Sequence, residues 1–137
     1  MAREVTEIEG YGALEDGQGR RFTVASGVKI AKGTVLKLTN NRTAIASTGT
    51  GDVFAGIAGA DKSATDLTTS ISAWENGIYE FTASGAVTVG EWVKTAAPGN
   101  YVMAATDADM TSSKALLVGI PQKTQTDGNR VQVRVNN

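Results

Sequence analysis

Few residues of this 137-residue chain have side chains suited to catalysis, because the sequence contains no histidine and no cysteine. Their absence removes thiolate and disulfide chemistry, the usual zinc sites and histidine acid–base catalysis. Ser26 and Lys29 match the S-x-x-K pattern of serine–lysine acyl enzymes. That chemistry needs the lysine one helical turn after the serine, whereas this segment begins a strand, and the companion Ser-Asp-Asn and Lys-Thr-Gly motifs are missing. We therefore expect no acyl-enzyme site.

Acidic pairs are the next candidates for chemistry. Asp107 and Asp109 resemble the start of a calcium loop, but the glycine and glutamate that such a loop needs further on are replaced by Ser112 and Val118. The other carboxylates have nothing nearby in sequence that would raise a pKa, so solvated surface charge explains them. The sequence predicts no catalytic residue, no metal site and no cofactor, and hence a protein that is not an enzyme.

Composition limits the partners. The chain contains 13 basic and 14 acidic residues. Its net charge of −1 argues against electrostatic binding to nucleic acid or anionic lipid. Apolar residues make up 41% of the chain, enough for a packed core. No apolar run is long enough to span a bilayer, and we expect no secretory signal, because the first residues are charged and glycine-rich.

The pattern of the chain favours strands. From Phe22 onward, short alternating apolar segments are separated by glycine turns, and 106–114 is the one stretch typical of a helical turn. Asn76-Gly77 is typical of a two-residue hairpin turn, which would pair Trp74 with Tyr79. The sequence therefore predicts an all-β fold, a small antiparallel β-barrel or sandwich with at most one short helix.

An internal repeat organises these strands. The segment 30–37 returns 57 residues later as 87–94, with a glycine, a polar residue, two apolar residues and a lysine in the same order. Two copies are too few for a solenoid, so we expect a pseudo-symmetric β-structure with repeats at about 28–83 and 86–135. Residues 1–24 lie before the repeats and are rich in glycine and charge, which favours an extended N-terminal arm attached to a single β-domain at 25–137.

At the level of the repeated unit, the chain resembles the capsid decoration (cement) proteins of tailed bacteriophages and related viruses. The similarity covers about residues 28 to 135 and contains no catalytic residue to carry over. The motifs that carry it are 89–94, 118–120 and the Asp127-Gly128 turn before 131–133, with 30–37, 56–58 and Asn76-Gly77 in the first copy.

The resemblance implies a structural protein on the outer surface of the virion, made in the host cytoplasm. It would bind the major capsid protein as a homotrimer and bridge neighbouring subunits against the pressure of packed DNA. The N-terminal arm would add main-chain hydrogen bonds to an exposed sheet edge and become ordered on the capsid. Its expected partner-binding residues are the apolar anchors Val5, Ile8, Tyr11 and Leu14, with Arg3, Glu4 and Glu7 at the rim.

Two other classes stay open. A carbohydrate-binding β-module would use Trp74, Tyr79 or Trp92 as an exposed stacking platform, and a coplanar exposed pair of aromatic rings would favour it. A small hydrolase using serine and lysine or carboxylates would need a deep pocket with a buried lysine beside a serine.

Overall fold

The computed structural model describes residues 4–10, 20–50, 52–65, 67–97, 99–112 and 117–136. Over these residues the chain forms eleven strands and one helix. They are β1 (Thr6–Gly10), β2 (Arg20–Thr23), β3 (Val35–Asn40), β4 (Thr43–Ala46), β5 (Phe54–Ala58), β6 (Ser70–Trp74), β7 (Asn76–Ala83), β8 (Val93–Ala96), β9 (Tyr101–Ala104), α1 (Asp107–Ser112), β10 (Leu117–Pro121) and β11 (Arg130–Asn136). The expected all-β fold with one short helix is confirmed.

The first half of the chain is a closed barrel in the order β2-β4-β3-β5-β6. β2 closes it by pairing antiparallel with β6 and parallel with β4. Alternate residues of each strand point inward, as the twofold period of a strand requires. The interior of this barrel consists of Phe22, Val24, Ile30, Leu36, Ala44, Ala55, Ala58, Ile71 and Ala73.

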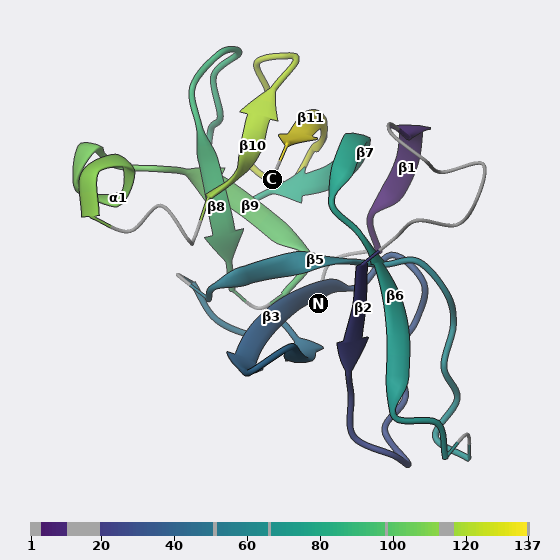
Figure 1. Cartoon of the computed structure of the whole chain (residues 1–137). Coiled ribbons are helices and arrows are strands. Elements are labelled where there is room, and N and C mark those ends of the chain that lie inside the picture. The colour runs from purple at the N-terminus through teal and green to yellow at the C-terminus, as the bar shows by residue number, and fades with distance from the viewer. Residues whose placement is uncertain are drawn as a thin grey trace.

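The second half repeats this topology strand for strand. β7, β11, β10, β8 and β9 follow one another, and a parallel pairing of β7 with β9 closes the ring. β1 pairs antiparallel with the first part of β7, at the edge of this sheet. Figure 1 shows the two barrels as separate halves of the molecule, with α1 projecting from the second one.

Fine detail also repeats between the two halves. The isolated bridge between Ile30 and Lys62 returns as the bridge between Val87 and Gln125. Arg42 and Asn100, at the same position before β4 and β9, are the two described non-glycine residues with positive φ, at 47° and 64°. The boundary between the copies falls at residue 75, earlier than the expected 83–86, because β7 pairs with β9 and β11 and so opens the second copy.

A close approach of strands explains the glycine at the centre of each repeated apolar motif. A Cβ on Gly56 would meet the carbonyl oxygen of Trp74, and a Cβ on Gly119 would meet that of Arg134. Both glycines occupy the same place, in β5 and β10, opposite the last strand of their barrel. Glycine is therefore required there by backbone packing.

The predicted hairpin around Asn76-Gly77 is wrong. β6 pairs with β2 and β5, and β7 pairs with β1, β9 and β11, so the chain crosses from one barrel to the other at this point. The expected contact between Trp74 and Tyr79 is present all the same, with ring centroids 5.5 Å apart and planes at 21°. It joins the barrels instead of two strands of a hairpin.

In the joint between the barrels, side chains on the outer face of the first barrel pack into the core of the second barrel. Val35, Phe54 and Ile57 are directed away from the first barrel's interior and belong to the core cluster of the second. At its margin the Asn100 side-chain oxygen accepts a 2.8 Å hydrogen bond from the Val35 amide. The Thr95 hydroxyl donates to the Asp52 carbonyl at 2.7 Å.

We expect Asn100→Ala to lower the free energy of unfolding by about 1–3 kcal/mol, because the buried Val35 amide would lose its acceptor. Chemical denaturation of the two proteins measures the difference. Asn41→Ala, on the exposed and equivalent turn of the first barrel, is the control and should change the value by less than about 0.5 kcal/mol. Equal effects of the two substitutions would contradict a specific role of Asn100 in the joint.

Candidate interaction surfaces

The N-terminal residues expected to bind a partner are placed as follows. Val5 is buried at 5% exposure in the core cluster that joins the barrels, and its amide donates to the Gly33 carbonyl at 2.7 Å. Glu4 is exposed, and Glu7 and Ile8 lie in β1, where only the backbone is described. Arg3, Tyr11 and Leu14 lie outside the described residues.

β1 is held on this protein's own sheet. Arg130 reaches across from β11 and donates to the Glu4 carbonyl at 3.0 Å and to the Thr6 hydroxyl at 3.3 Å, while its guanidinium also pairs with Glu80 at 3.4 Å. No strand in the described part of the chain pairs with the other side of β1. Among the described residues, β1 therefore has an unpaired edge, the kind of surface to which another chain can add a strand.

Val5→Ala should lower the free energy of unfolding by about 2 kcal/mol, because shortening this buried side chain leaves a cavity between the barrels. Thermal unfolding measures the loss. Val28→Ala, at an exposed position, serves as the matched control and should be nearly neutral. Unchanged stability of the Val5 variant would mean that this residue is free for a partner, as the sequence predicts.

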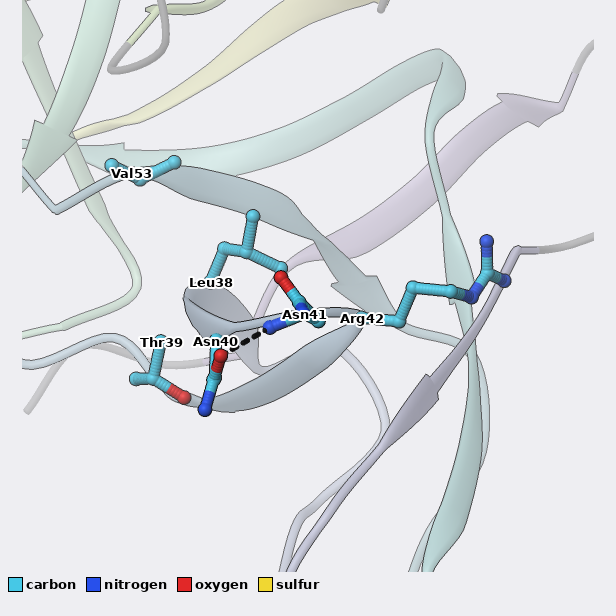
Figure 2. Close-up of a pocket in the computed structure, with 6 residues that line it drawn as sticks. All are labelled: Leu38, Thr39, Asn40, Asn41, Arg42 and Val53. Atoms are coloured by element: carbon cyan, nitrogen blue, oxygen red, sulfur yellow. Dashed lines mark hydrogen bonds between the residues drawn. The ribbon is translucent and has the colours of Figure 1, made fainter.

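The first groove lies at the β3–β4 turn and has a volume of about 610 Å³. Figure 2 shows Leu38 and Val53 side by side, and Arg42 extending from the turn toward β2, where it donates to the Arg21 carbonyl at 2.9 Å. The turn is fixed locally by a 2.8 Å hydrogen bond from the Asn41 amide to the Asn40 side chain. The groove offers an apolar patch, and the Arg42 guanidinium lies on its far side, directed toward β2.

A second groove, of about 460 Å³, lies on the other barrel between β8 and the start of α1. Trp92 is half-buried in it, and Met110 contributes an exposed apolar side chain. Glu91 and Asp107 are exposed at its margin. This surface is therefore apolar at its centre and acidic at its margin, the opposite charge to the first groove.

The segment behind each groove is fixed by an equivalent ion pair. Lys37 lies 3.7 Å from Asp52 in the first barrel, and Lys94 lies 2.8 Å from Asp109 in the second. Asp109 also accepts from the amide and hydroxyl of Thr106, and the Thr106 hydroxyl accepts from the Asp109 amide, so Thr106 caps α1. The hydrogen bond from Lys94, followed by those from Thr106, lowers the pKa of Asp109 from 3.8 to about 2.

Asp52 balances opposing influences. Burial would raise the pKa of its carboxyl, but hydrogen bonds from the Gly49 and Thr48 amides and the Ser47 hydroxyl, together with Lys37, lower it below 3.8. Both aspartates are therefore charged at neutral pH, and their role is to hold loops in place.

Asp109→Asn should lower the melting temperature at pH 7 and weaken the acid sensitivity of the protein. The folded-state pKa of Asp109 lies below its ordinary value, so its contribution is present above 3.8 and is lost as the pH falls toward about 2. Melting temperatures at pH 7, 4 and 2 test this: the two proteins should differ most at pH 7 and least at pH 2. Asp107→Asn, on the same helix, is the control, and a difference that stays constant with pH would contradict the assignment.

The features required by the two other classes are not brought together. Tyr79, which stacks on Trp74, is fully buried, so this aromatic pair is no exposed platform. Lys62 is buried at 3% exposure, but its ammonium donates to the Val28 carbonyl at 2.9 Å, and neither groove is lined by a serine or a lysine. Ser26 is exposed.

The described residues form neither a metal-binding cluster nor a membrane-spanning helix. No group of three or more acidic residues there could hold a metal ion. No helix in the same residues has the length and apolar character needed to cross a membrane.

Sequence reasoning missed both grooves. From the sequence, Leu38 and Arg42 have no assigned role, and Trp92 is only a candidate residue for stacking on sugars. The available signal was the repeat itself, since the equivalent residues of the other copy, Thr95 and Asn100, differ in polarity or charge at these positions.

Comparison with known proteins adds a likeness in fold. No family model matches the sequence, and no curated protein matches it significantly. Among solved structures, the chain is similar to the N base of the head fiber gp8.5 in bacteriophage phi29, with a TM-score of 0.55 and 13% sequence identity. The match covers 85% of this chain and 93% of that one, so it spans both barrels, and at this identity it is a likeness of fold.

Proposed function

We propose that this protein is a structural component of a tailed-phage virion that binds the outer surface of the assembled capsid. In this proposal it acts as a homotrimer, contacts the major capsid protein and bridges neighbouring subunits. The observation that carries the proposal is the fold shared with a phage head fiber base over 85% of the chain. The sequence motifs that resemble decoration proteins support the same class independently.

The described surface is suited to such a role. β1 offers main-chain donors and acceptors at an open sheet edge, and its own attachment through Arg130 holds that edge in place. Main-chain pairing gives affinity without requiring a large apolar patch on the free protein. Tyr11 and Leu14, which follow β1 in the sequence, remain the proposed apolar anchors, whereas Val5 is committed to the core.

The test is co-sedimentation with DNA-free shells assembled from the major capsid protein of the virus that carries the gene. We expect saturable binding to shells, weak binding to unassembled capsid protein, and a higher temperature of shell disruption when the protein is bound. Absence of binding to intact shells would overturn the proposal.

The double variant Tyr11→Ala with Leu14→Ala should weaken shell binding about tenfold or more, the size of loss expected for a pair of buried anchors. Its melting temperature should stay close to that of the unmodified protein. Val28→Ala is the matched surface control. Full binding by the double variant would remove the anchors from the proposal while leaving the open edge of β1 as the contact.

A further inference from the structure

The joint inside the chain consists of two surfaces that can be defined by residues. The platform of the first barrel is Thr34, Val35, Thr50 and Asp52, on the outer side of β3 and the loop before β5. The turn of the second barrel comprises the described residues 95–97, 99 and 100, from the end of β8 to the start of β9. Hydrogen bonds between described residues connect them: from the Val35 amide to Asn100, from Thr95 to the Asp52 carbonyl, and from the Ala97 amide to the Thr50 hydroxyl at 3.0 Å.

Because the barrels are duplicates, each carries both surfaces, and the joint uses only one of each. The turn of the first barrel is 38–42, equivalent to 95–100, and the platform of the second barrel is Glu91, Trp92, Asp107 and Asp109, equivalent to Thr34, Val35, Thr50 and Asp52. Ion pairs at the same place in each barrel, Lys37 with Asp52 and Lys94 with Asp109, fix this correspondence.

Three equivalent positions are buried in the used surfaces and more exposed in the unused ones. Thr95 and Asn100 are exposed by 1% and 2%, whereas Leu38 is exposed by 40% and Arg42 is also exposed. On the platforms, Val35 is exposed by 1%, whereas its equivalent Trp92 is only half-buried. The two grooves described above coincide with the unused turn and the unused platform.

At two equivalent positions the unused surfaces carry a larger apolar side chain than the used ones. A polar threonine in the used turn is replaced by Leu38 in the free one, and Val35 of the used platform is replaced by the larger Trp92. Exposed apolar side chains in contiguous grooves indicate a contact surface instead of a solvated one.

Charges follow the same division. Asn100 of the used turn is replaced by Arg42 in the free turn. Thr34 and Thr50 of the used platform are replaced by Glu91 and Asp107 in the free one. The joint inside the chain thus carries no charge beyond the Lys37–Asp52 ion pair, while the two free surfaces carry opposite charges. This arrangement favours pairing of one free surface with the other and disfavours either surface meeting itself.

We propose that the turn of the first barrel of one copy docks on the platform of the second barrel of the next copy, repeating head to tail the joint that already connects the barrels within each chain. Such a heterologous contact closes into a ring or continues as a filament, according to the rotation between copies. That three copies associate rests on the proposed function, in which the protein is a homotrimer. The contact between copies is independent of that function.

Light scattering after size-exclusion chromatography tests the contact without any capsid. The unmodified protein should form a multimer whose fraction rises with concentration. Leu38→Asp should give a monomer, because a carboxylate would enter the apolar groove around Trp92. Leu67→Asp, a substitution of a more exposed leucine of the same barrel, should leave the multimer intact. A monomer at every concentration, or equal effects of the two substitutions, would overturn the proposal.

Charge reversal identifies the surfaces that meet. Arg42→Glu and Glu91→Arg should each weaken association about 100-fold or more by placing like charges together. The double variant, which restores opposite charges, should recover most of the association. Circular dichroism confirms that each variant is folded, and a double variant no better than the single ones would contradict the pairing of these surfaces.

Mixing distinguishes head-to-tail contact from a symmetric one. Leu38→Asp protein retains a working platform, and Glu91→Arg protein retains a working turn, so together they should form a one-to-one dimer and nothing larger. Absence of that dimer, with the single variants monomeric, would overturn the head-to-tail arrangement. Shell binding by monomeric Leu38→Asp would show that capsid attachment survives loss of this contact, so the two proposals can fail separately.

Discussion

The outer side of the first barrel carries large apolar side chains that are unfavourable in water, and the arrangement of the two barrels follows from the need to bury them. Val35, Phe54 and Ile57 point away from their own barrel and are exposed by 8% or less. Burying side chains of this size contributes about 1.5–3 kcal/mol each. β5 is consequently buried on both faces, and the second barrel serves as the cover that a single small barrel would lack.

Duplication then divides the sequence into a conserved frame and a divergent exterior. The interiors correspond position by position, with Phe22 matched by Phe81 and Leu36 by Val93, because both barrels must fill the same space. The glycines that allow strands to approach and the lysine–aspartate pairs are kept for the same reason. The outer surfaces have no such common requirement, and it is there that threonine and asparagine in one copy are replaced by leucine and arginine in the other.

The sequence was informative where structure depends on local pattern. Alternation and glycine turns predict an all-β fold, and the stretch 106–114 predicts its one short helix. It was misleading where pairing depends on distant partners. Asn76-Gly77 has the composition of a hairpin turn, but β7 finds β11, some fifty residues on, because only that pairing closes the second barrel. β2 was likewise assigned to the arm, since four residues cannot reveal that they complete a barrel whose other strands come later.

The segment that connects the two barrels is very short. β6 ends at Trp74 and β7 begins at Asn76, so one residue connects the two units, and Trp74 stacks on Tyr79 immediately across it. A connection this short, alongside a packed joint, gives no hinge about which one barrel could swing relative to the other. A mechanical force applied to one barrel is therefore transmitted to the other through this short connection and the packed joint, and the two barrels respond as one rigid body.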